Sequence, residues 1–337
     1  MNKPEYEALM LRALELASLS PEYGINPQVG ALLVDDNGKI VAEGWHKGAG
    51  TAHAEVDALS KVADARGLTA IVTLEPCNHT GRTGPCSQAL VDAGVKRVVF
   101  GTIDPGKNEG GGQHTLEAAG VEVITDVLQD QAKALIRPWL ISKKENRPYV
   151  VIKWASSLDG RTAAADGTSK WITSAQSRAD VHLRRSKSQA IIAGTNTVEI
   201  DNAELTARKE DGSPYGSQPL RVVVGNRQLS KDLRVFNDLA ETIQLKTHDP
   251  KQVLSQLFER GIRQVFVEGG ATLESSFIEA GLADEFLIYL APKLLGGPRT
   301  AIADIGVKHI SESIDLEVFE MKQLGADLML RAQKKES

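Results

Sequence analysis

Short apolar segments alternate with amphipathic segments along the whole 337-residue chain, and this alternation limits its fold more than any other feature. Segments rich in β-branched residues predict strands, whereas apolar residues at helical spacing predict helices. Strands that alternate with helices are typical of an α/β fold, in which helices cover the faces of a sheet. At roughly 150 residues per domain, the length predicts two such domains.

The first series of segments predicts a three-layer α/β domain. Tyr6, Met10, Ala13 and Ala17 lie on one face of an expected helix at 6–17. An Asn-Gly pair between two apolar runs predicts a hairpin. The other expected elements are strands at 29–34, 40–45, 69–74, 97–101 and 121–125, and helices at 54–62, 87–93 and 115–119.

The second series predicts a different α/β domain, because no internal repeat relates the two halves. A polar, charged stretch at 142–148 ends in proline and predicts a hinge, with a domain boundary near residue 147. Residues 209–218 are rich in Gly, Ser and Pro and predict an exposed loop. The expected elements are strands at 149–154, 190–193, 220–224, 264–267 and 285–290, and helices at 177–186, 252–260 and 272–280.

Charge and hydropathy argue against several classes of protein. The chain has 39 basic and 44 acidic side chains, and its net charge of −5 does not favour nucleic-acid binding. No segment approaches the ~20 apolar residues of a membrane helix. Three glutamates lie among the first 15 residues, without the basic and apolar regions of a signal peptide. We therefore expect a cytoplasmic protein that binds neither membranes nor nucleic acid. We also expect a homo-oligomer.

Residues 53–86 contain the strongest chemical signal, which consists of His53-Ala54-Glu55, Pro76-Cys77 and Cys86. A catalytic zinc uses three nitrogen or sulfur ligands from the protein and leaves the fourth position to water. His53, Cys77 and Cys86 provide such a set for one Zn²⁺ per chain. Glu55 could then carry protons between that water and a leaving group. This pattern is typical of zinc nucleobase deaminases.

Other interpretations of these residues stay open. A structural zinc site would need a fourth ligand, which His79 could supply. Without any metal, the two cysteines could simply be small buried residues. Eight residues separate Cys77 from Cys86, where nucleobase deaminases usually have two. This longer loop could contact a large anionic substrate, or it could be a flexible surface segment that only presents Cys86.

Four motifs in the first half are Asn-Pro-Gln-Val-Gly at 26–30, His-Ala-Glu-Val at 53–56, Thr-Leu-Glu-Pro-Cys at 73–77 and Gly-Arg-Thr-Gly-Pro-Cys at 81–86. They resemble the bifunctional riboflavin-biosynthesis deaminase–reductase family. The resemblance implies a cytidine-deaminase-like domain at 1–146 that removes an amino group from a ribosylaminopyrimidine 5′-phosphate. It also implies that zinc is bound by His53, Cys77 and Cys86, and that Glu55 is the proton donor.

The second half lacks the G-x-G-x-x-G pattern of a Rossmann dinucleotide site. Instead, Gly269-Gly270 joins the expected strand at 264–267 to the helix that follows. Glycines at such a turn allow backbone N–H groups to approach a phosphate at the start of the helix. A tight turn without a ligand is the alternative.

Further motifs at 156–162, 169–173, 267–273 and 291–297 resemble the reductase domain of the same family. The resemblance implies a dihydrofolate-reductase-like domain at 147–337 that uses NADPH to reduce a ribosyl group to a ribityl chain. The implied NADPH contacts are Ala155, Trp171, Thr197, Asp201, Gly270, Ala271, Thr272, Leu273, Glu274, Ser275 and Ser276. The implied contacts to the phosphorylated pyrimidine substrate are Ser169, Arg185, Leu205, Arg208 and Glu268.

The residue types suit these roles. Arg185 and Arg208 could pair with a phosphate in forked geometry, and Trp171 offers a flat face to a ring. Alternatively, Arg185 is a solvated helix charge and Trp171 a core residue. Three other functions stay open for the whole chain: a deaminase whose second half only binds a ligand, an RNA-editing deaminase and a zinc-stabilised structural protein.

Overall fold

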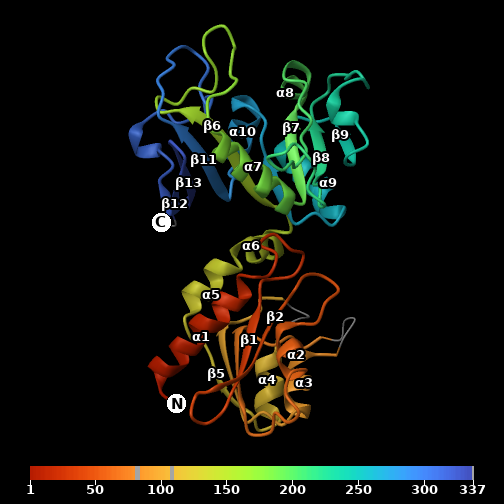
Figure 1. Cartoon of the computed structure of the whole chain (residues 1–337), viewed down its shortest axis with the longest axis vertical. Helices are drawn as coiled ribbons and strands as arrows, with labels where there is room; N and C mark the ends of the chain where they lie inside the picture. The colour runs from red at the N-terminus through yellow and green to blue at the C-terminus, as the bar shows by residue number, and fades with distance from the viewer. Residues whose placement is uncertain (80–83, 107–109, 336–337) are drawn as a thin grey trace. The chain divides into compact units, whose positions relative to one another are not determined.

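The computed structural model describes residues 1–79, 84–106 and 110–335. The chain divides into two compact units, Met1–Asn146 and Arg147–Ser337. Each unit contains one mixed β-sheet and its own helices, which confirms the predicted α/β class (Figure 1). No helix in the described ranges is both long enough and apolar enough to cross a membrane.

The first unit contains a five-stranded sheet in the order β2-β1-β3-β4-β5. Strand β1 pairs antiparallel with β2 and β3, whereas β3, β4 and β5 are parallel. The strands are β1 (Gly30–Val34), β2 (Ile40–Trp45), β3 (Thr69–Leu74), β4 (Arg97–Thr102) and β5 (Glu122–Ile124). The helices are α1 (Lys3–Ala17), α2 (Ala54–Leu59), α3 (Cys86–Asp92), α4 (Gly112–Ala118), α5 (Gln129–Leu135) and α6 (Arg137–Glu145).

Helices cover both faces of this sheet, and β1 is therefore buried at all of its positions. Successive side chains of a strand point to opposite faces, so Leu32 joins the core that contains Met10 of α1, while Leu33 joins the core that contains Ala54 of α2. Figure 1 shows α1 and α5 on one side of the sheet and α2, α3 and α4 on the other. The predicted three-layer arrangement is confirmed.

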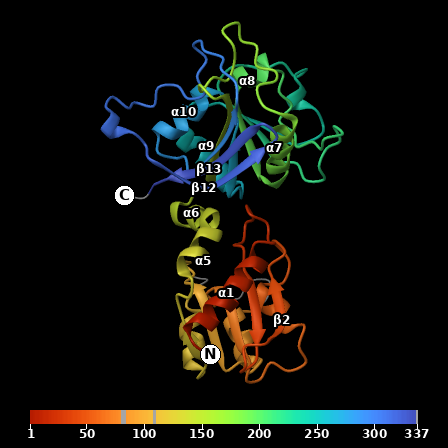
Figure 2. The same cartoon turned by 60° about the vertical axis from the view of Figure 1, so that its left-hand side comes forward.

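The second unit contains an eight-stranded sheet in the order β12-β13-β11-β6-β10-β7-β8-β9. The six strands from β11 to β9 are parallel, and β13 and β12 extend the sheet as an antiparallel pair (Figure 2). The strands are β6 (Tyr149–Ser157), β7 (Ala190–Gly194), β8 (Leu220–Val224), β9 (Thr242–Leu245), β10 (Gln264–Val267), β11 (Glu285–Ala291), β12 (Leu316–Leu324) and β13 (Asp327–Lys334). The helices are α7 (Ala175–Lys187), α8 (Thr195–Ile200), α9 (Pro250–Glu259), α10 (Ala271–Glu279) and the 3₁₀ turns η1 (Arg234–Phe236) and η2 (Ile310–Glu312).

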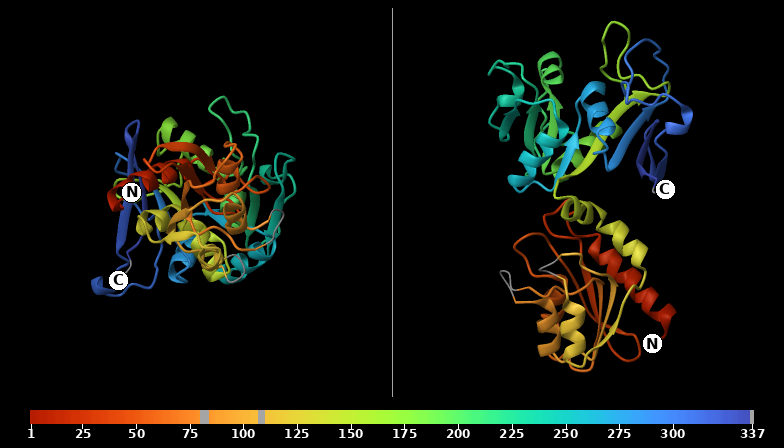
Figure 3. Two further views of the ribbon diagram at one scale, coloured as in Figure 1. Left: turned by 90° about the horizontal axis from the view of Figure 1, so that it is seen from below. Right: turned by 180° about the vertical axis from the view of Figure 1, so that it is seen from behind.

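Apolar residues of α9 and α10 form the core on one face of this sheet. Leu257 of α9 and Phe277 of α10 belong to the same buried cluster as Val150 and Ile152 of β6. Figure 1 shows α7 in front of the sheet, and the view from behind in Figure 3 brings α9 and α10 forward. Because parallel strands end at the same edge of a sheet, the segments that follow β6, β7, β8 and β10 meet there.

Two sets of sequence predictions differ from the structure. Residues 142–145 of the stretch predicted as a hinge belong to α6, which continues to Glu145 and ends at Asn146, whose φ of 52° is typical of a helix end. The division between the two units follows directly, between Asn146 and Arg147. The sequence predictions also omitted α5, α8, β9, β12 and β13. Strand β12 is exposed at most positions, so its sequence has no continuous apolar run that would indicate a strand.

Candidate active sites

Three residues that lie far apart in the sequence form a candidate metal site in the first unit. His53 immediately precedes α2, Cys77 follows β3, and Cys86 is the first residue of α3. The Nδ1 atom of His53 lies 3.3 Å from Sγ of Cys86 and 3.6 Å from Sγ of Cys77. Tetrahedral zinc, with bonds of ~2.3 Å to sulfur and ~2.0 Å to nitrogen, places such atoms about 3.5 Å apart. The donor types and their spacing therefore fit zinc.

The two thiols differ in acidity. Hydrogen bonding with the Cys86 thiol lowers the pKa of Cys77 to about 4, and the same contact raises the pKa of Cys86. The pair thus favours a thiolate at Cys77, the form that binds zinc. No fourth histidine, cysteine or carboxylate belongs to this group within the described residues, and His79 is not part of it. This set of three ligands matches an open catalytic site better than a closed structural one.

Glu55 lies beside the three candidate ligands and is not part of their group. It belongs to the first turn of α2 and is 5% exposed. Burial raises the pKa of its carboxyl to about 7, and the charge of Cys77 acts in the same direction. A buried carboxyl in this place can hold or release a proton next to a molecule at the metal site.

Two further polar residues support this site and were not predicted from the sequence. The His46 ring contacts the Ala52 carbonyl through Nδ1 and the Asn26 amide through Nε2, both at 3.0 Å, and packs edge-on against His53. Glu75 accepts hydrogen bonds from three backbone N–H groups at the start of α4 and the segment before it. The available sequence signal for Glu75 was its position directly before Pro76-Cys77.

The sequence predicts a substrate contact from the loop between Cys77 and Cys86. Residues 80–83 of this loop lie outside the residues that the structure describes.

The second unit has a pocket of about 1080 Å³ at the carboxyl edge of its parallel strands. Most of the reductase residues implied by the sequence line it. They are Ala155, Ser169, Arg185, Thr197, Asp201, Leu205, Glu268, Gly270, Ala271, Thr272, Leu273, Glu274 and Ser276. The pocket thus brings together segments that follow β6, β7 and β10 with part of α7.

Three implied contacts do not line this pocket. Ser275 is buried and accepts a hydrogen bond from the backbone N–H of Ala303. Trp171 is 64% exposed with the Arg178 guanidinium over its ring, so it is not a core residue. Arg208 instead donates hydrogen bonds to neighbouring side chains outside the lining set.

A buried charged cluster occupies one part of the pocket. Arg185 donates from Nε and Nη2 to the two carboxylate oxygens of Glu268, at 2.6 and 2.8 Å, and Lys153 donates to Glu268 at 3.2 Å. Burial alone would raise the pKa of Glu268, but the two cations outweigh it and lower the pKa to about 2. Arg185 is therefore no solvated helix charge, and its forked face is turned to Glu268.

Lys153 was not predicted as a site residue. The signal for it was a single charge inside the otherwise apolar strand 149–154.

The backbone of the Gly269-Gly270 turn has a geometry that would allow a ligand to approach it closely. Gly270 has a φ of 75° and directly precedes α10, whose first turn lines the pocket. At this φ, a residue with a side chain is strained. Glu274 in that turn is 3% exposed, and burial raises its pKa to about 8. The helix therefore begins at the pocket with a carboxyl that favours the neutral form.

Comparisons with known families match both units. The cytidine and deoxycytidylate deaminase zinc-binding region matches residues 3–102, and the RibD C-terminal domain matches residues 148–330. The riboflavin biosynthesis protein RibD of Mycobacterium tuberculosis (strain ATCC 25618 / H37Rv) is 46% identical over 306 residues, which cover 90% of each chain. That of Escherichia coli (strain K12) is 36% identical, covering 96% of this chain and 98% of its own length.

Solved structures agree with these matches. Acinetobacter baumannii RibD, form 1, has a TM-score of 0.90 and 36% identity, covering 99% of this chain and 100% of its own. A Thermotoga maritima protein described as a diaminohydroxyphosphoribosylaminopyrimidine deaminase and 5-amino-6-(5-phosphoribosylamino)uracil reductase has a TM-score of 0.87 and 34% identity, with 99% of each chain covered. The chain belongs to the RibD family and is a bifunctional deaminase–reductase of riboflavin biosynthesis.

Proposed function

We propose that the chain catalyses two consecutive reactions. The first is the zinc-dependent hydrolytic deamination of 2,5-diamino-6-(5-phosphoribosylamino)pyrimidin-4-one. The second is the NADPH-dependent reduction of the ribosyl group of the resulting aminouracil to a ribityl chain. The observation that carries the proposal is the presence, in one chain, of two features. One is a group of one histidine and two cysteines that could hold a metal ion beside Glu55, and the other is a separate large pocket with a buried Glu268–Arg185–Lys153 cluster.

In the first unit, His53, Cys77 and Cys86 would hold the zinc ion. Zinc bound there would lower the pKa of a water molecule and so supply a nucleophile. Glu55 is the acid–base residue in this proposal, because its buried carboxyl lies next to the ligands and outside their set. It takes a proton from the water and delivers one to the departing amino group.

In the second unit, the start of α10 would bind the diphosphate of NADPH, because backbone N–H groups at a helix start attract phosphate. Thr197 and Asp201 line the same pocket from α8 and its end. The nicotinamide supplies the hydride. Glu268, held by Arg185 and Lys153, would contact the ribosyl group and fix the position of the carbon that is reduced.

Mass analysis separates the two reactions. Purified protein is loaded with zinc and incubated with the diaminopyrimidine ribosyl phosphate, with or without NADPH. Replacing an amino group by oxygen raises the mass by about 1 Da, and reduction adds about 2 Da more. The activity of each half of the chain is therefore measured by a product of its own mass. Deamination without NADPH-dependent reduction would favour a second half that only binds a ligand, and no turnover would contradict the proposal.

The variant Glu55→Gln tests the acid–base residue. An amide cannot carry the proton, so deamination should fall by about 10²–10⁴-fold while zinc content stays normal. The exposed Glu117→Gln variant, in the same unit, serves as the control and should deaminate normally. Reduction of supplied deaminated substrate should be unchanged in both variants. Near-normal deamination by zinc-loaded Glu55→Gln would remove Glu55 from this role.

A further inference from the structure

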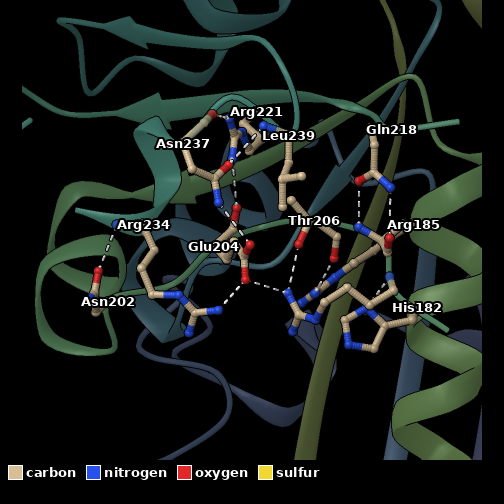
Figure 4. Close-up of polar contacts among 12 residues, drawn as sticks. His182, Arg185, Asn202, Glu204, Thr206, Gln218, Arg221, Arg234, Asn237 and Leu239 are labelled. Carbon is tan, nitrogen blue, oxygen red and sulfur yellow. Dashed lines mark hydrogen bonds and ion pairs between the residues drawn. The ribbon is translucent and has the colours of Figure 1, made fainter. Parts of the chain in front are cut away.

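A carboxylate bridges two arginines near the pocket of the second unit. Glu204 accepts a hydrogen bond of 3.0 Å from Nη1 of Arg208 and also pairs with Nη2 of Arg234. The Nδ2 group of Asn237 donates to the other carboxylate oxygen at 2.9 Å. The Glu204 side chain is 8% exposed, whereas those of Arg208 and Arg234 are 31% and 58% exposed. Figure 4 shows Glu204 between Arg234 and Asn237.

Buried hydrogen bonds hold this bridge in place. Arg221 of β8 is fully buried and donates to the Asn237 side chain at 2.7 Å, to the Asn237 carbonyl at 2.6 Å and to the Glu204 carbonyl at 3.3 Å (Figure 4). Asn202 accepts from the backbone N–H of Arg234 at 2.9 Å. Three segments of the chain are thus tied together, and the position of Arg234 follows from the fold rather than from a chance surface contact.

Arg208 is fixed next to Arg185, which lines the pocket. Its Nη1 also donates to Oγ1 of Thr206 at 2.7 Å, and its backbone N–H donates to Nδ1 of His182 at 3.2 Å. The carbonyl of Thr206 accepts from Nη1 of Arg185 at 3.2 Å. One short segment therefore connects the guanidinium of Arg208 to the Glu268–Arg185–Lys153 cluster.

The bridge has more positive than negative charge. Arg208 and Arg234 share Glu204 as the only carboxylate paired with either of them in the described ranges. Burial, together with the charges of Arg185 and Arg234, lowers the pKa of Arg208. Burial and the nearby arginines likewise lower the pKa of His182 to about 4. This region has a positive potential that an anion would neutralise.

Both arginines also keep hydrogen-bond donors for an anion. In the part of the chain that the structure describes, Nε and Nη2 of Arg208 donate to no protein acceptor, and neither do Nε and Nη1 of Arg234. Guanidinium groups bind phosphate through paired N–H donors, which gives strong and directional hydrogen bonds.

We propose that Arg208 and Arg234 are two arms of a binding site for the phosphate ester of the reductase substrate, and that Glu204 is the positioning residue that holds both. The proposal rests on the proposed function of the second unit. It adds Arg234 and Glu204 to the residues implied by the sequence. It also gives a role to Arg208, which does not line the pocket.

The variant Arg234→Gln tests the second arm. Its KM for the phosphorylated aminouracil substrate should rise roughly tenfold at saturating NADPH, because one charged hydrogen-bond partner is lost, while kcat changes less than twofold. With the dephosphorylated substrate, wild type and variant should have the same KM. Arg260→Gln is the matched control, because Arg260 is 52% exposed and faces Glu241 on the surface of the same unit.

Glu204→Gln tests the positioning role through coupling. If Glu204 acts by holding Arg234, adding Arg234→Gln to Glu204→Gln should raise KM by much less than the product of the two single effects. Independent multiplication of the two effects would contradict the positioning role. Should Glu204→Gln fail to fold, Arg234→Gln with the two substrates still decides whether Arg234 binds the phosphate.

The outcomes also separate this inference from the proposed function. A wild-type protein that does not reduce the substrate with NADPH overturns the proposed function. A wild type that reduces it, together with an Arg234→Gln variant whose preference for the phosphorylated substrate is unchanged, overturns the phosphate site alone.

Discussion

Gly44 of β2 lies directly against the backbone of Ala54, the first residue of α2. A Cβ atom at Gly44 would be 2.3 Å from the Ala54 carbonyl oxygen and 2.5 Å from the Ala58 nitrogen. Only glycine therefore allows α2 to lie this close to the sheet. Because His53 precedes α2 and Glu55 lies in its first turn, this contact sets the depth at which the proposed zinc ligand and the proposed acid–base residue lie.

The variant Gly44→Ala should move α2 away from the sheet. Overpacking of this kind costs about 1–3 kcal/mol of unfolding free energy, and displacement of His53 should weaken zinc binding. Chemical unfolding and competition with a zinc chelator measure the two effects. Gly216→Ala is the control, since a Cβ there meets nothing within 4 Å. Unchanged zinc affinity in a destabilised Gly44→Ala protein would show that α2 does not set the ligand position.

The variant Cys77→Ser should lose zinc, because a hydroxyl is a much weaker ligand than a thiolate for this ion. Elemental analysis after dialysis should find about one zinc per chain in the wild type and little in the variant. The first unit should also unfold at a lower temperature, since bound metal adds to folding stability. NADPH binding should stay normal. One zinc per chain in Cys77→Ser would contradict the assignment of this ligand.

The variant Gly270→Val should raise the Kd for NADPH by tenfold or more, because a side chain would obstruct the approach of phosphate to α10 and the φ of 75° would be strained. Thermal unfolding with and without NADPH measures this loss of affinity, because a ligand that binds the native state raises the unfolding temperature. Gly281→Val controls for backbone strain alone, since Gly281 has a φ of 69° and no atom within 4 Å of its Cβ position. Equal NADPH stabilisation of wild type and a folded Gly270→Val would exclude this turn as the phosphate site.

Glu274 makes the stability of the second unit depend on pH. Burial raises the pKa of its carboxyl from an ordinary 4.5 to about 8 in the folded state. Between these two values the folded state binds more protons than the unfolded state, so stability falls as pH rises through this window. Glu274→Gln should remove that fall and should stabilise the protein at pH 9 by up to a few kcal/mol.

The control for this measurement is Glu279→Gln, which changes an exposed glutamate on the same helix. Urea unfolding at pH 5, 7 and 9 compares the three proteins. If the stability of Glu274→Gln depends on pH as steeply as that of the wild type, the prediction is wrong. Glu274 would then ionise in the folded protein without loss of stability.

The candidate metal site could be predicted from the sequence because histidine and cysteine in such short motifs are rare. His53, Cys77 and Cys86 needed only a plausible strand and helix frame to be brought together. The bridge at Glu204 could not be predicted, since it depends on Arg234 and Asn237, whose segment reaches Glu204 only in the folded sheet.

Exposure explains most of the missed elements. Helix α6 ends in Lys143-Lys144-Glu145, and in the sequence alone such a run of charged residues resembles a linker. Strand β12 lies at the edge of its sheet, and charged residues interrupt its exposed apolar side chains Val318, Phe319 and Met321, so no continuous apolar run indicates a strand. The central strands β8 and β10 were predicted with their observed bounds, because burial on both faces makes them mostly apolar, with Arg221 and Gln264 as the exceptions.

Every strand pairing in the described residues joins two strands of the same unit, β1 to β5 in one sheet and β6 to β13 in the other. Each sheet is therefore formed by one uninterrupted part of the chain. A break between Asn146 and Arg147 would remove no ladder of backbone hydrogen bonds. The arrangement is thus compatible with two separate genes as well as with one, and fusion guarantees that a cell makes the two catalysts in equal numbers.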